Sequence, residues 1–193
     1  MAARSGGVYT RAASYAPDGD LMGSVLGLVA LYLAALAVRT SYELLKKAGR
    51  VDPGSRALSL TILLDMILLW GSWFTLCSLD PARLVLPALM RRTGLAALVV
   101  GLVLAVGALI QLRGVENIDH LVTTGLFGVV RHPMYLGFIL WILGWAVFQG
   151  SVVGLALGLV GIANILLWRR LEERHLEARY GDAYRTYRAG TSF

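Results

Sequence analysis

Two clusters near the C-terminal end of the chain carry the side chains best suited to chemistry. The first is Arg131-His132-Pro133-Met134-Tyr135-Leu136-Gly137. The second is Arg169-Arg170-Leu171-Glu172-Glu173, followed by Tyr180-Gly181-Asp182-Ala183-Tyr184-Arg185-Thr186-Tyr187. Together they offer cations, carboxylates, an imidazole and aromatic rings. A zwitterionic, partly aromatic ligand would find a partner there for each of its groups. These residues indicate a binding site, and by themselves they define no reaction.

Simpler interpretations of both clusters stay open on spacing alone. Arginine and tyrosine are common anchors at the ends of membrane helices. Arg169 and Glu173 are four residues apart, so a surface ion pair on a helix also explains them. His132 precedes Pro133 and could merely cap a helix.

The clusters border long apolar runs, which determine the fold class. Hydrophobic residues make up 57% of the 193 residues and charged residues 16%, whereas soluble domains are about 45–50% apolar and about 25% charged. We therefore predict an all-α, multi-pass transmembrane helical bundle with about five spans. The expected spans are Leu21–Val38, Ala57–Leu79, Gly94–Leu112, Met134–Phe148 and Val152–Trp168.

The segments between these spans differ in length and in character. Arg39–Arg56 is predicted to be a polar loop, and Arg113–His132 is a polar segment of a length that is often functional. Only Gln149, Gly150 and Ser151 separate the last two runs, which predicts a tight helical hairpin. Such a hairpin returns to the surface where it began, so the two polar clusters should become neighbours.

Charge predicts the orientation and argues against a nucleic-acid partner. The chain has a net charge of +6, but its basic residues flank the apolar runs, a pattern typical of membrane orientation. With five spans and the N-terminus outside, thirteen Lys and Arg residues lie on the inner side and five on the outer side. We therefore expect a cytoplasmic C-terminus, on the same side as the 113–132 segment. The short chain, without a recognisable targeting segment, favours a prokaryotic plasma membrane.

Three further features have narrower interpretations. Asp65 lies in the middle of a span, where a carboxylate is either functional or paired with a neighbouring hydroxyl or amide. Gly154 and Gly158 form a small-xxx-small pair typical of close helix packing. Cys77 is the only cysteine, which excludes an intrachain disulfide.

The polar clusters and the segment before them resemble a known superfamily. Five features follow one another in the order found in that superfamily. They are the segment His120-Leu121-Val122-Thr123-Thr124-Gly125-Leu126-Phe127, the Arg-His-Pro-Met-Tyr-Leu-Gly cluster, the hairpin, the Glu pair and the closing tyrosine segment. This arrangement over about residues 111–193 resembles the isoprenylcysteine carboxyl methyltransferase and phospholipid methyltransferase superfamily. Phe127 departs from the usual tyrosine, and Asp119 stands where relatives can have histidine.

The resemblance implies a membrane methyltransferase that uses S-adenosyl-L-methionine. It also implies that the segments that bind this cofactor lie on the cytoplasmic side. From composition we expect a flexible N-terminal segment at 1–20 and three transmembrane helices within 21–112. The resemblance implies a cofactor-binding loop, helical hairpin and C-terminal polar helix within 113–193. The cofactor contacts carried over by position are His120, Leu121, Val122, Phe127, His132, Pro133, Met134, Tyr135, Glu172 and Glu173. Arg169, His132 and Glu173 are the expected catalytic residues, and no metal is expected.

Methyl transfer from a sulfonium needs alignment and exclusion of water more than it needs further catalytic groups. The acceptor is expected to be lipophilic or small and membrane-partitioning: a prenylcysteine carboxylate, an isoprenoid, a phospholipid amine or a thiol. Two rival hypotheses remain: an NADPH-dependent membrane reductase of the sterol type, and a non-enzymatic membrane scaffold. The sequence does not indicate an oligomeric state.

Overall fold

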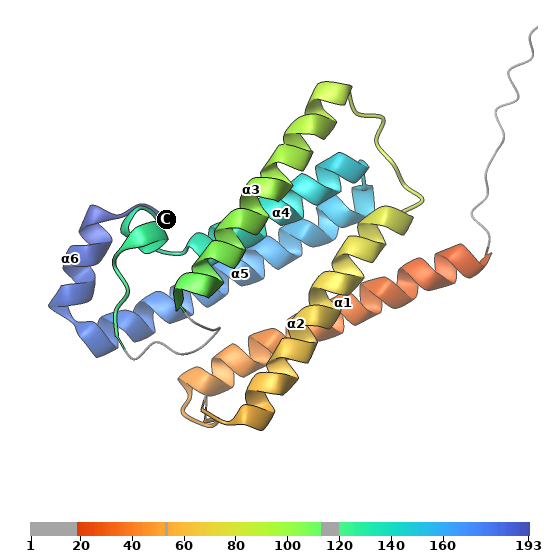
Figure 1. Cartoon of the computed structure of the whole chain (residues 1–193). Helices are drawn as coiled ribbons and strands as arrows, with labels where there is room; N and C mark the ends of the chain where they lie inside the picture. Colours follow the sequence, from red (N-terminus) through yellow and green to blue (C-terminus); the bar gives the residue numbers. More distant parts are fainter. Residues whose placement is uncertain (1–18, 53, 113–119) are drawn as a thin grey trace, which may run out of the picture.

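The computed structural model describes residues 19–52, 54–112 and 120–193. Six α-helices and one short 3-10 helix follow one another along the described chain (Figure 1). They are α1 (Gly19–Lys47), α2 (Arg56–Leu79), α3 (Ala88–Leu112), η1 (Gly125–Gly128), α4 (Pro133–Gln149), α5 (Val152–Tyr180) and α6 (Asp182–Gly190). The predicted all-α class is confirmed. Most of the predicted flexible segment 1–20 and part of the 113–132 segment lie outside the described residues.

Four of these helices are long and apolar enough to cross a membrane, namely α1, α2, α3 and α5, and α4 is a shorter apolar helix of 17 residues. Large apolar side chains such as Leu26, Leu64 and Val103 are exposed on the outer faces of the bundle. In water such exposure would be costly, whereas lipid chains are a suitable environment for these side chains. The structure is therefore that of a multi-pass membrane protein.

One prediction of local structure is wrong, because α1 does not end at Val38. The helix continues through the predicted polar loop as far as Lys47. Arg39 and Glu43, four residues apart, form an ion pair on the helix and are both buried. Lys46 and Lys47 occupy the last turn, where cations interact favourably with the helix dipole. These polar residues thus extend a membrane helix instead of ending it.

Helices α3 and α4 make the closest contact in the bundle, through glycines on both helices. A Cβ atom added at Gly144 would lie 2.5 Å from the backbone nitrogen of Leu98 and 2.6 Å from the carbonyl oxygen of Gly94. One at Gly101 would lie 2.6 Å from the carbonyl oxygen of Gly137. Glycine therefore lets the two backbones touch, as is common between membrane helices.

The predicted hairpin between α4 and α5 is confirmed, and Figure 1 shows its two arms side by side. Gly150 adopts the left-handed conformation (φ 66°) that ends α4. Ser151 caps α5 by accepting a hydrogen bond from the backbone N–H of Gly154. The buried Asp80 accepts hydrogen bonds from the Ser151 hydroxyl (2.6 Å) and the Val153 backbone N–H (2.8 Å). The connection after α2 thus fixes the hairpin turn.

The prediction that the glycines of α5 allow close packing is also confirmed. A Cβ added at Gly158 would collide with Ile142 and Trp73, and one at Gly161 would collide with Tyr32. Helix α5 therefore packs tightly against α1, α2 and α4. This packing places the polar second half of α5 beside the start of α4.

Candidate functional site

The segment that leads into α4 is held by the C-terminus of the chain. The Tyr187 hydroxyl donates a hydrogen bond to the Phe127 carbonyl (2.6 Å). The Arg131 backbone N–H donates to the Ser192 carbonyl (3.0 Å), and the Arg131 guanidinium donates to the Arg188 carbonyl (3.0 Å). Helix α6 and the residues after it thus fasten η1 to the start of α4.

A second set of hydrogen bonds ties η1 to the end of α3. The Gln111 side chain donates to the Thr124 carbonyl (2.6 Å) and accepts from the Leu126 backbone N–H (3.1 Å). Gly125, between these two residues, has a positive φ of 59° that favours glycine. Together the two sets fix Phe127 in position.

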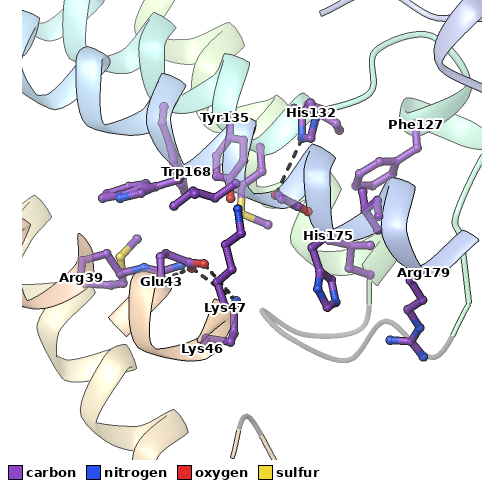
Figure 2. A pocket seen from close by; sticks show the side chains of 18 of the residues that line it. Arg39, Glu43, Lys46, Lys47, Phe127, His132, Tyr135, Trp168, His175 and Arg179 are labelled. Carbon is purple, nitrogen blue, oxygen red and sulfur yellow. Dashed lines mark hydrogen bonds and ion pairs between the residues drawn. The ribbon is translucent and has the colours of Figure 1, made fainter. Parts of the chain in front are cut away.

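Residues mainly from α1, α4 and α5, with Phe127 and one residue each from α2 and α3, enclose a cavity of about 290 Å³ (Figure 2). This volume is near the lower end of the roughly 300–1,000 Å³ typical of small-molecule sites. The lining residues are Arg39, Glu43, Lys46, Lys47, Met66, Leu112, Phe127, His132, Pro133, Met134, Tyr135, Phe138, Trp168, Leu171, Glu172, His175, Leu176, Arg179 and Tyr180. Apolar and aromatic groups therefore meet charged side chains around one space.

His132 joins the two predicted polar clusters, which confirms that they are neighbours. Its side chain is buried, with Nε2 3.3 Å from Glu173 Oε1 and Nδ1 3.8 Å from Glu172 Oε2. The imidazole stacks against the Tyr135 ring, with 5.5 Å between the ring centres. His132 stands at the N-cap of α4, but its side chain makes no capping hydrogen bond. His132 is therefore the N-cap residue by position, but its side chain contacts the Glu pair instead of capping the helix.

Glu173 is the centre of an ion-pair network beside the cavity. Its Oε1 lies 3.2 Å from Arg169 Nε and 3.5 Å from Arg131 Nε, in addition to its contact with His132. The hydrogen bond from His132 and the nearby Arg169 lower the pKa of Glu173 from 4.5 to about 2. The predicted surface ion pair between Arg169 and Glu173 is therefore present, as part of a larger network.

This network predicts a specific dependence of stability on pH. A carboxyl group whose pKa is lower in the folded state stabilises the fold above its unfolded pKa, and this contribution is lost as the pH falls toward the folded pKa. Thermal unfolding of the wild type and Glu173→Gln should therefore differ most well above pH 4.5, and the difference should shrink as the pH falls from 4.5 toward 2. Glu177→Gln, which removes an exposed partner of Arg185 and Arg188, is the control and should have little effect at any pH. A difference for Glu173→Gln that does not change with pH would contradict the network.

Tyr180 and Tyr184, two tyrosines of the closing segment, have buried hydroxyls that find no hydrogen-bond partner among the described residues. Tyr180 lines the cavity, so its hydroxyl can serve a ligand. Tyr184 is fully buried, and burial raises its pKa to about 12, so it stays protonated at neutral pH.

The structure brings most of the predicted site residues to the cavity, but not all. Of the predicted cofactor contacts, Phe127, His132, Pro133, Met134, Tyr135 and Glu172 line it. Glu173 and Arg169 lie in the network beside it, and the Arg169 guanidinium also sits 4.5 Å from the centre of the Phe193 ring. His120 is exposed, Leu121 and Val122 are half-buried, and none of these three lines the cavity. The roles of all these residues remain predictions.

Sequence reasoning missed the wall of the cavity that α1 supplies. Arg39, Glu43, Lys46 and Lys47 all line the cavity, yet they fell within a segment predicted to be a loop. The spacing of Arg39, Glu43 and Lys46–Lys47 by four and then three or four residues is typical of one helix face, and was the available signal. Trp168 was missed because it was counted only as the end of an apolar run. Its indole N–H donates to the Thr40 hydroxyl (3.1 Å), which joins α5 to α1.

Comparison with known proteins identifies the protein family that the cavity-forming part of the chain resembles. Residues 89–183 match the phospholipid methyltransferase family, and this match contains η1, α4, α5 and all of the cavity residues outside α1 and α2. The resemblance to the isoprenylcysteine carboxyl methyltransferase and phospholipid methyltransferase superfamily is therefore confirmed.

Two curated relatives are similar to part of the chain. Protein-S-isoprenylcysteine O-methyltransferase of Schizosaccharomyces pombe is 38% identical over 80 residues, which cover 38% of this chain and 32% of the relative. Methanethiol S-methyltransferase of Pseudomonas deceptionensis is 37% identical over 81 residues, which cover 42% of this chain and 30% of the relative. The match thus spans about a third of the length of each relative. No solved structure gives a significant match.

Proposed function

We propose that the protein is an integral membrane methyltransferase that uses S-adenosyl-L-methionine and acts on a lipophilic or small membrane-partitioning acceptor. The observation that carries the proposal is the cavity where α1, α4 and α5 meet, lined by His132, Tyr135 and Glu172. The residues of the two clusters that line it lie within the region matched by the family. Both named relatives are methyltransferases, and their two acceptors differ in kind.

The lining residues fit the chemistry of this cofactor. The Glu172 carboxylate is suited to its amino or ribose groups, and the Phe127 and Tyr135 rings are suited to the adenine or, by cation–π attraction, to the sulfonium. The Tyr180 hydroxyl, buried without a partner among the described residues, adds one more polar group. When bound, S-adenosyl-L-methionine supplies an activated methyl group on sulfur.

The residues of the chain would then act chiefly by positioning. In the proposed transfer, the acceptor's lone pair would form the new bond to the methyl carbon, and the electron pair of the broken carbon–sulfur bond would stay on sulfur. Aligning the reactants and excluding water can contribute about 7–11 kcal/mol. A carboxylate or thiolate acceptor releases no proton, whereas a protonated amine must lose one. His132 lines the cavity and is the candidate base for that case, with Glu173 fixing its orientation.

We also propose that the cavity opens at the cytoplasmic side of the membrane. Lys46, Lys47 and Arg179 line it, with Lys47 and Arg179 exposed, and the positive-inside rule places such residues on the cytoplasmic face. In this orientation the soluble cofactor reaches the cavity from the cytoplasm and the acceptor reaches it from the bilayer.

Thermal unfolding of the detergent-solubilised protein tests the cofactor. A ligand at 100 times its dissociation constant adds about 2.7 kcal/mol of stability, so S-adenosylhomocysteine should raise the unfolding temperature clearly. NADPH is the control for the reductase hypothesis and should leave the temperature unchanged. A shift with NADPH alone would favour a reductase, and a shift with neither ligand would favour a membrane scaffold.

A further inference from the structure

The cavity has one wall that lies outside the region matched by the family. The match covers residues 89–183, whereas Arg39, Glu43, Lys46 and Lys47 come from the last turns of α1. Figure 2 shows Lys46 and Lys47 across the cavity from His175 and Arg179 of α5. A wall that is separate from the shared motif is a suitable place for the features that select an acceptor.

The α1 wall is firmly held. The side chains of Arg39 and Glu43 are both more than nine-tenths buried and form an ion pair, and Lys46 Nζ lies 3.2 Å from Glu43 Oε2. The Arg39 guanidinium also lies 5.3 Å from the centre of the Trp168 ring, which lines the same cavity. Cations fixed in this way lose little freedom when they bind an anion, which favours affinity.

The charge of the lining residues indicates which kind of acceptor fits. Among the described residues, four Lys or Arg side chains and two carboxylates line the cavity. If the histidines are counted as neutral, the lining therefore has an excess of two positive charges. Asp65 lies close enough to Arg39 for electrostatic interaction but does not line the cavity. S-adenosyl-L-methionine itself carries one net positive charge at neutral pH. Binding it would increase the positive charge in a partly buried space, where charges of one sign repel more strongly than in water.

We propose that the α1 wall binds the acceptor, and that the acceptor carries an anionic group, a carboxylate or a phosphate, close to the site of methylation. Such a group would balance the combined charge of the cavity and the cofactor, whereas an ammonium group would add to the repulsion. This proposal rests on the proposed function, and it favours an acceptor whose head group is net negative over a phospholipid amine, whose ammonium group offsets its own phosphate. Lys47 and Arg179 supply the charges at the edge, and Arg39 supplies the fixed cation deeper in the wall.

The test compares three ligands with the same chain and different head groups: decanoate, decanethiol and decylamine. Their dissociation constants are measured on protein in phosphatidylcholine nanodiscs saturated with S-adenosylhomocysteine. Decanoate should bind most tightly, and Lys47→Gln should weaken it about tenfold, the effect expected when one charged partner is lost. Arg39→Lys keeps the charge but loses the planar guanidinium, and should also weaken decanoate binding. Arg50→Gln is the matched control and should change nothing, because Arg50 is exposed beyond the end of α1 and does not line the cavity.

The outcomes separate this proposal from the proposed function. Equal binding of the three head groups, or tightest binding of decylamine, would overturn the anionic acceptor while leaving the methyltransferase intact. 5′-Methylthioadenosine lacks the carboxylate of S-adenosylhomocysteine and serves as a further control. If Lys47→Gln weakened the binding of S-adenosylhomocysteine but not that of 5′-methylthioadenosine, the cations would serve the cofactor's own carboxylate. This result too would overturn the proposal. A wild-type protein that does not bind S-adenosylhomocysteine at all would overturn the proposed function itself.

Discussion

Replacing His132 with alanine is expected to weaken S-adenosylhomocysteine binding roughly tenfold to a hundredfold, measured by isothermal titration on protein in nanodiscs. His132 lines the cavity, contacts both glutamates and stacks against Tyr135. Its loss removes a buried hydrogen bond to a charged group, worth about 1.5–3 kcal/mol. It also leaves Glu173 with only the two arginines, so the start of α4 loses a tie to α5.

His120 offers a matched control for this experiment. The resemblance assigned both histidines to the cofactor, but the structure places His120 on the surface and outside the cavity lining. His120→Ala should therefore leave the affinity unchanged, within about twofold. Equal losses in His120→Ala and His132→Ala would contradict the site described here and would favour the assignment by position alone. Unchanged affinity in His132→Ala would also contradict it.

Replacing Gly144 with alanine is expected to destabilise the protein by about 3 kcal/mol, the upper end of the range for overpacking. The added Cβ would lie within 2.6 Å of backbone atoms of α3, which cannot rotate away as a side chain can. Helices α3 and α4 would have to separate along the closest contact of the bundle. Thermal unfolding in detergent measures the effect as a lower unfolding temperature.

Gly71→Ala is the control, because nothing lies within 4 Å of an added Cβ at this position in α2. Alanine favours a helix over glycine by roughly 1 kcal/mol, so this variant should be as stable as the wild type or slightly more so. A Gly144→Ala protein with wild-type stability would show that the α3–α4 contact is looser than described.

The helices and the hairpin were predictable from sequence because apolar runs in lipid have few alternatives. A membrane segment must satisfy its own backbone hydrogen bonds, so each long run forms a helix. The turn at Gly150 and Ser151 followed from the shortness of the link, and the contact of His132 with the Glu pair followed from the hairpin. The charged end of α1 was missed because polarity was taken to end a membrane helix.

The exact wall of the cavity could not be predicted for a different reason. Whether a residue lines the space or lies beside it depends on helix rotation and on contacts between distant segments. Glu172 and Glu173 are adjacent in sequence, but Glu172 lines the cavity while Glu173 binds arginines beside it. Likewise, the tyrosines of the closing segment divide their roles: Tyr180 lines the cavity and Tyr187 holds the Phe127 carbonyl. Only the packed structure distinguishes these neighbours.

The transfer of a radioactive methyl group tests the central claim most directly. Protein in nanodiscs would be incubated with S-adenosyl-L-methionine labelled in the methyl group and with acceptors bearing carboxylate, thiol or amine heads, and the products would be extracted into an organic solvent. We expect labelled product from the wild type, most from a carboxylate acceptor, and much less from His132→Ala. No labelled product from any of the three acceptor classes, in a folded protein that also fails to bind S-adenosylhomocysteine, would contradict the assignment as a membrane methyltransferase.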